Sequence, residues 1–262
     1  MSASSPAPAD ASRPAWRVKP FLARAALALG ALALLGAVAS GLGARLGLWP
    51  FRTGFQILSY AAYGGAGAAV LSLAALAWPR GIRSRKSALY ALPALVLGFA
   101  SFAYPVYLLH IGRTVPRIHD ITTDVENPPA FVAVVPLRSG AENPSAYEGA
   151  QVAEAQQKAY PEIKPLHLAA GPPDVFKAAL ATARDFGWEV VAAVPAEGRI
   201  EATATSFWYG FKDDVVIRIA AEGEQTRVDM RSDSRVGKSD FGVNARRVVT
   251  FLTALKGRVA GG

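Results

Sequence analysis

The residues best placed to do chemistry lie in a short polar stretch near the C-terminus, "RSDSRVGK". It contains Arg231, Ser232, Ser234, Arg235 and Lys238. Guanidinium and ammonium groups bind phosphate and carboxylate oxygens, and hydroxyl groups can donate to the same oxygens. A periodic apolar segment follows, so the stretch leads into a helix N-terminus, where free backbone amides and the helix dipole favour anions. This pattern predicts a site for a small anion or a lipid headgroup.

Two further polar residues extend this candidate site. Asn244 and Arg247 follow Asp240 by four and seven positions, which places all three on one flank of the predicted helix. However, Asp233 and Asp240 lie among the basic residues and could neutralise them. The sequence therefore leaves two interpretations open, an anion site and an internal network of ion pairs.

The tripeptide Gly237-Lys238-Ser239 resembles the end of a nucleotide-binding loop but lacks its beginning. That loop requires a glycine five residues before Gly237, so that backbone amides can wrap the phosphates. This position holds Ser232. We therefore expect no nucleotide.

Catalytic arrangements are weakly supported. The histidines show no metal-ligand spacing, and neighbouring residues such as Asp213 and Asp214 point to opposite faces if they lie on a strand. The alternative to a binding function is a hydrolase or transferase that uses Asp213, Asp214, Asp240 or His119 as acid or base. It requires several of these groups to converge in one cleft.

The net charge of +8 is unevenly distributed along the 262 residues. The first 111 residues hold ten basic residues and one acidic residue, whereas the rest hold 18 basic and 19 acidic residues. The C-terminal part therefore has no excess positive charge with which to follow a nucleic-acid backbone. The chain also contains no cysteine, which excludes disulfides and thiolate metal sites. We expect no nucleic acid, no metal and no cofactor.

Three long apolar runs without charged residues precede the polar part of the chain. They are Ala25–Ala44, Thr53–Pro79 and Ser87–Leu109. Each reaches the about 20 residues that a helix needs to cross a bilayer. We therefore predict three transmembrane helices within residues 24–111, rich in the small residues that let helices pack closely. The first run also resembles a signal-peptide core with a small-residue cleavage motif at Ala37-Val38-Ala39, so its cleavage is left open.

Basic residues beside these runs predict the orientation. The N-terminal tail, residues 1–23, is rich in proline, alanine and serine, which predicts disorder. The segment before the first run and the loop "PRGIRSRKS" together hold eight basic residues, and the opposite side holds four. The positive-inside rule then places the tail and this loop in the cytoplasm. The C-terminal domain, residues 112–262, would lie in the periplasm of a bacterial inner membrane.

The C-terminal part has the pattern of a two-layer α+β domain, an antiparallel sheet packed on two helices. Pro172 and Pro173 open one helix that Gly187 ends, and Ser239 or Asp240 caps a second helix with a periodic apolar stripe. Between them the predicted strands are "WEVVAAV", "RIEATATSF", "DVVIRIA" and "TRVDMRS". The stretch before the first helix is expected to be extended at its start and then irregular.

Alternation along these strands places apolar residues on one sheet face, under the helices, and polar residues on the other. The polar face predicts either a solvated surface with cross-strand ion pairs or a binding surface. The aromatic segment "FWYGF", Phe207 to Phe211, lies between two strands. It could fill the core, form a hairpin tip, or contact a partner or the bilayer interface.

Several segments resemble, in order, the motifs of a known family. They are "HDITTDVENPPAF", "YPEIKPL", "RIEATATS", "GFKDDVVIRI" and "RVDMRSDSRVGKSDFGVNARRV". Together they are similar to the family catalogued as domain of unknown function 1499, over about Ile118 to Leu255. The resemblance implies a bacterial or plastid envelope protein, and some relatives have membrane helices ahead of the domain. It transfers no activity, cofactor or catalytic residue.

These observations favour a non-enzymatic function. We expect an inner-membrane protein whose outer domain binds or assembles with membrane lipids, a small anion or another envelope or membrane protein.

Overall fold

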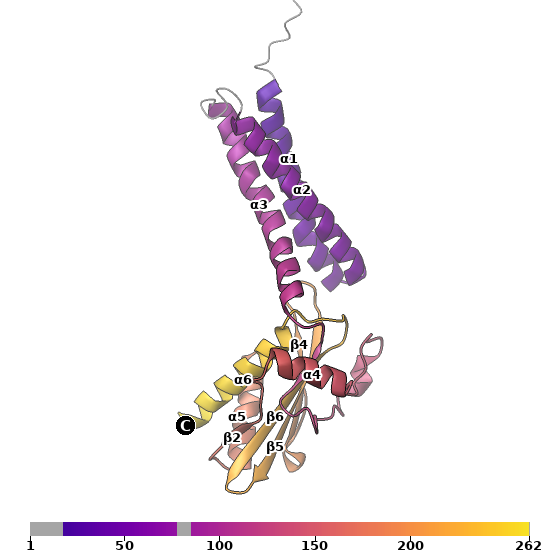
Figure 1. Cartoon of the computed structure of the whole chain (residues 1–262), viewed down its shortest axis with the longest axis vertical. Coiled ribbons are helices and arrows are strands. Elements are labelled where there is room, and N and C mark those ends of the chain that lie inside the picture. The colour runs from indigo at the N-terminus through magenta and orange to yellow at the C-terminus, as the bar shows by residue number, and fades with distance from the viewer. Residues whose placement is uncertain (1–17, 78–84, 262) are drawn as a thin grey trace, which may run out of the picture. The chain divides into compact units, whose positions relative to one another are not determined.

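The computed structural model describes residues 18–77 and 85–261. They form two compact units, one ending at Tyr107 and the other beginning at Leu108 (Figure 1). Most of the predicted disordered tail and most of the basic loop "PRGIRSRKS" lie outside the described residues.

The first unit contains helices α1 (Val18–Arg45), α2 (Phe51–Ala77) and most of α3 (Arg85–Thr114). By length and composition, each is long and apolar enough to cross a membrane. At a rise of about 1.5 Å per residue, the shortest apolar segment, Phe21–Arg45, exceeds the hydrocarbon thickness of about 30 Å. This confirms the prediction of three helices that are long and apolar enough to cross a membrane.

Small residues set the closest approach between α2 and α3. A Cβ atom added at Gly65 would lie 2.7 Å from the carbonyl oxygen of Gly98, and one added at Gly98 would lie 2.6 Å from the carbonyl oxygen of Gly65. No side chain fits at either position without moving a backbone. The two glycines therefore allow direct backbone contact, as expected for helices that pack through small residues.

The second unit is an antiparallel sheet with helices, which confirms the predicted α+β class. The path β1-β6-β5-β4-β3 runs through the sheet, and β2 also pairs with β6. The strands are β1 (Asp120–Thr122), β2 (Leu166–Leu168), β3 (Glu189–Val194), β4 (Arg199–Thr205), β5 (Lys212–Glu222) and β6 (Gln225–Ser234). The helices are α4 (Ala150–Ala159), α5 (Pro172–Asp185) and α6 (Val243–Ala260), with 3-10 turns η1 (Val135–Arg138) and η2 (Pro195–Glu197).

Helices α5 and α6 cover the apolar face of the sheet and bury the core there. Their buried residues pack against the alternating apolar residues of β4, β5 and β6, as the sequence predicts. Phe251 of α6 is fully buried and stacks on Trp188 with ring centroids 5.3 Å apart. The N-cap residue of α6 is Gly242 and not the expected Ser239 or Asp240, although the Asp240 carboxylate accepts the backbone N–H groups of Gly242 and Asn244 at the start of the helix.

Helix α4 lies in the stretch that was expected to be irregular. It is short, and its buried positions are Val152 and the polar Gln156, so it has no apolar stripe to predict it. The Gln156 amide donates to the carbonyl oxygen of Thr122 at 2.6 Å and accepts from the Thr122 N–H at 3.0 Å. This side chain thus satisfies the free edge of β1 in place of another strand.

Candidate functional site

Three aspartates lie side by side on the polar face of the sheet. Asp120 of β1 is opposite Asp233 of β6, and Asp233 is also opposite Asp214 of β5. All three are buried. Like charges directly opposite each other on a sheet repel, and the repulsion grows away from water. We call these residues the aspartate row, and its stability depends on cations that reach it.

Three arginines and one histidine neutralise the aspartate row. Arg231 donates to both carboxylate oxygens of Asp120, with Nε at 2.9 Å and Nη2 at 2.7 Å. Arg138 donates to Asp214 at 2.8 Å and to Asp233 at 2.7 Å, and so joins two members of the row. Arg235 also binds Asp214, through Nε at 2.9 Å and Nη2 at 2.8 Å. Each carboxylate therefore has at least one guanidinium partner.

A segment with little regular structure covers this face. We call residues 124–148 the cover segment; it carries η1 and Arg138. The buried carboxylate of Glu201 on β4 accepts the N–H groups of three consecutive residues of the segment, Val132, Ala133 and Val134, at 3.0, 2.9 and 3.0 Å. A carboxylate is well suited to such a row of donors. The polar face, predicted to be a solvated or binding surface, is thus largely enclosed by the chain itself.

An aromatic residue and a carbonyl group of the cover segment complete the surroundings of Arg231. Its guanidinium lies over the ring of Phe131, 4.7 Å from the centroid, and donates to the carbonyl oxygen of Ser145 at 3.0 Å. The Arg231 side chain is only 2% exposed. Burial raises the pKa of Asp120 to about 6, although Arg231 opposes that shift.

His119 connects the aspartate row to the end of the cover segment. Its Nδ1 lies 2.8 Å from Asp233, and its Nε2 lies 3.0 Å from Glu148, which is partly exposed. Burial by itself would lower the pKa of His119. The hydrogen bond and charge of Asp233, with the charges of Glu148 and Asp120, raise this pKa above its usual value. When it is protonated, His119 can donate to both carboxylates, one through each ring nitrogen.

A second polar cluster lies on the opposite face, between β6 and α6. Ser232 donates to the side-chain oxygen of Asn244 at 2.7 Å, and Asn244 donates to Ser234 at 2.9 Å. Arg247 donates to Ser232 at 3.0 Å and to Asp213 at 2.6 Å. This cluster orients the first turns of α6 on the sheet.

The structure thus divides the seven predicted site residues among several places. Four of them form the cluster between β6 and α6: Ser232, Ser234, Asn244 and Arg247. Arg231 is enclosed beneath the cover segment, Arg235 pairs with Asp214 at its edge, and Lys238 is exposed. The arginines follow the second interpretation of the sequence, an internal network of ion pairs. Anion binding at this loop stays a prediction.

The acid–base candidates of the enzymatic alternative are also engaged with neighbouring groups. Asp213 and Asp214 point to opposite faces of β5, as their adjacency on a strand implies, and each binds arginine. Asp240 accepts backbone N–H groups at the start of α6, and His119 lies beside the aspartate row. Among the described residues, no group of three or more histidine or acidic side chains has a metal-binding arrangement.

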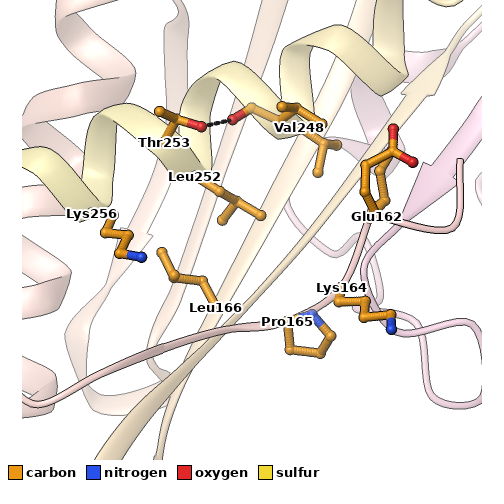
Figure 2. Close-up of a pocket in the computed structure, with 10 residues that line it drawn as sticks. Glu162, Lys164, Pro165, Leu166, Val248, Leu252, Thr253 and Lys256 are labelled. Atoms are coloured by element: carbon orange, nitrogen blue, oxygen red, sulfur yellow. Dashed lines mark hydrogen bonds between the residues drawn. The ribbon is translucent and has the colours of Figure 1, made fainter.

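An apolar groove lies between α6 and the residues that lead into β2. It has a volume of about 320 Å³ and is lined by residues 162–166 and by α6 residues between Val248 and Lys256. Figure 2 shows Leu252 and Lys256 extending from α6 toward Leu166. Glu162 and Lys164 add one charge of each sign to its lining. Sequence reasoning missed this groove, because its two sides are about 85 residues apart in the chain.

Comparisons with known proteins add a family and one partly similar structure. A family model described as "Protein of unknown function (DUF1499)" matches residues 120–255, more than half of the chain. The crystal structure of TTHA0849 from Thermus thermophilus is similar over 37% of this chain and 94% of that one, at 18% identity and a TM-score of 0.24. No curated protein matches the chain significantly.

Proposed function

The chain belongs to the DUF1499 family of proteins of unknown function, and we propose that it is a multi-pass inner-membrane protein with a non-enzymatic outer binding module. In this proposal the N-terminus is cytoplasmic and the domain of residues 112–262 is periplasmic. Three helices of sufficient length and apolarity support insertion. The excess of basic residues before the first apolar run and between the second and third runs supports the orientation.

One observation carries the binding function: the ion pairs around the aspartate row are enclosed, whereas the open groove is lined mainly by apolar surface. The aspartate row and His119 are buried and bound to partners within the domain. The groove instead presents Leu166 and Leu252 beside two lysines, Lys164 and Lys256, and one acid, Glu162. This composition suits an apolar chain with an anionic head, because the apolar part gains from burial and the head from a nearby ammonium group.

Of the three ligand classes that the sequence allows, we therefore favour an anionic lipid over a small free anion or a protein. A small anion would leave the apolar lining in water. The lining residues also lie on two elements that are packed on the sheet, so the groove is formed before a ligand arrives.

The test is native mass spectrometry of the full-length protein, extracted from its own membrane with a mild detergent. We expect an acidic lipid to be retained by the wild type and lost in Leu252→Asp and in the double variant Lys164→Ala/Lys256→Ala. The matched control is Lys158→Ala/Lys177→Ala, which removes two exposed lysines outside the groove.

Each outcome bears on the proposal. Equal lipid retention in the groove variants and the control would contradict a groove site, since lipid then binds elsewhere, for example on the apolar helices. A retained polypeptide that the groove variants lose would replace the lipid by a protein partner. A measured turnover that Asp214→Asn or His119→Gln abolishes would favour the enzymatic alternative.

A further inference from the structure

A rigid aromatic turn joins β4 to β5. We call Ser206–Phe211 the aromatic tip. Its backbone is closed by a hydrogen bond from the Ser206 N–H to the Phe211 carbonyl oxygen at 2.8 Å, and by one from the Phe211 N–H to the Ser206 hydroxyl at 2.9 Å. The Tyr209 and Phe211 rings stack with centroids 5.3 Å apart. Phe207 is 84% exposed, so the turn presents a large apolar side chain on a fixed support.

Strand register places the aromatic tip at the end of the sheet where the chain arrives from α3. Lys212, the first residue of β5, follows the tip directly, and Asp213 pairs with Ser234 at the end of β6. Asp233 pairs in turn with Asp120, the first residue of β1. The chain enters β1 at this same end, five residues after α3 ends at Thr114. Fully extended, five residues reach at most about 18 Å.

The last turn of α3 belongs to the same compact unit as the sheet and packs on it. A Cβ atom added at Gly112 would lie 2.7 Å from the ring of Phe241, in the loop between β6 and α6. Since α3 is a candidate membrane span, its outer end marks the position of the bilayer surface. The short connection keeps the start of β1 within about 18 Å of the end of α3.

The two ends of the sheet differ in composition as a membrane contact requires. The turn at the far end, Glu222–Gln225, carries two glutamates and no aromatic residue. The near end carries the aromatic tip and the exposed acid Glu142, whose backbone N–H binds the Arg235 carbonyl oxygen. Exposed basic residues close to this end in the chain include Arg113, Arg117, Lys212 and Lys238. Tryptophan and tyrosine favour the membrane–water interface, and exposed bases favour anionic headgroups.

We propose that the aromatic tip rests in the headgroup region of the bilayer, with Phe207 directed toward the acyl chains. The domain then has two attachments to the membrane, the covalent one through α3 and a second one through the tip. This inference is independent of the groove and its ligand.

The chain contains no cysteine, so a thiol-reactive spin label will attach only at a cysteine that is introduced by mutation. The experiment uses full-length Phe207→Cys, labelled with a nitroxide, in vesicles of phosphatidylethanolamine and phosphatidylglycerol. The matched control is Glu224→Cys at the exposed turn of the far end. We expect the label at position 207 to remain accessible to oxygen and to lose its accessibility to a water-soluble nickel complex. The label at position 224 should remain fully accessible to nickel.

Equal nickel accessibility at the two positions would overturn the proposal, because the tip would then lie in water. Low accessibility to both reagents at position 207 would also overturn it, since protein would then cover the tip. A second measurement avoids the label. Brominated lipids should quench the wild type more than Trp208→Phe, and equal quenching of the two proteins would refute the lipid contact.

Discussion

The pair formed by Arg231 and Asp120 offers the sharpest test of the enclosed network. Arg231→Met keeps most of the apolar volume of the side chain but removes the guanidinium. Asp120, 1% exposed, then keeps a buried charge without its bidentate partner. Breaking a buried pair in this way costs about 3–5 kcal/mol of unfolding free energy. We expect a loss in this range at pH 8.

The loss should depend on pH in a defined direction. Burial already holds the pKa of Asp120 at about 6 in the folded protein, above its ordinary value of 3.8, and removal of Arg231 raises this pKa further. The folded state therefore binds a proton more readily than the unfolded state. This preference stabilises the fold fully below pH 3.8 and is lost as the pH rises through the folded pKa. Arg231→Met should thus be less destabilising at about pH 5 than at pH 8.

Hydrogen exchange of β6 amides in the full-length protein, in detergent, measures this free energy. The matched control is Arg227→Met, on the same face of β6 but partly exposed, which should cost about 1 kcal/mol or less. The double variant Arg231→Met/Asp120→Leu should recover much of the loss, because it removes the orphaned charge. A loss below about 1 kcal/mol for Arg231→Met, or one independent of pH, would refute a buried charge pair.

Three further predictions concern the domain. Glu201→Gln places an amide N–H against the three backbone donors of the cover segment and should cost about 1–3 kcal/mol of unfolding free energy. Hydrogen exchange in residues 132–134 should become faster in this variant but not in the control Glu197→Gln, whose side chain is exposed. Equal exchange in the two variants would contradict the binding of these N–H groups by Glu201. The pKa of His119 is raised in the folded protein, so His119 contributes stability that is present below pH 6.5 and is lost as the pH rises through the folded pKa. Urea titrations should therefore show that the unfolding free energy of His119→Gln declines less above pH 6.5 than that of the wild type. Gly198→Ala would place a Cβ atom 1.9 Å from the Ile219 carbonyl oxygen and should lower the melting temperature strongly. The control is Gly223→Ala, where φ is similarly positive but no atom lies near the added Cβ. Similar melting temperatures of the two variants would contradict the close approach at Gly198.

Sequence reasoning worked where one residue type repeats with the period of the element. The apolar runs predicted the helices of the first unit, and alternation predicted β4, β5 and β6 with the correct inward face. Pro172 at the start of α5 and Gly187 after its end mark that helix through backbone chemistry alone. These signals are local, so they do not depend on what the element later contacts.

The aspartate row could not be predicted in this way. Asp120, Asp214 and Asp233 come from three strands, and only the pairing register brings them together. The cover segment has no period to read, because its contacts are made by backbone groups and by single side chains such as Arg138. The burial of the arginines therefore could not be predicted without knowing that this segment covers them.

The enclosed charges explain how an irregular segment can form one layer of this domain. A segment without helix or strand leaves its backbone N–H and C=O groups unpaired, and each costs free energy when buried. Here Glu201 accepts three such N–H groups, and Arg231 and Arg138 donate to carbonyl oxygens of Ser145, Asn143 and Pro144. Apolar residues at the same strand positions could bury surface but could not satisfy these groups. The charged face of the sheet thus serves as the hydrogen-bonding partner of the cover segment.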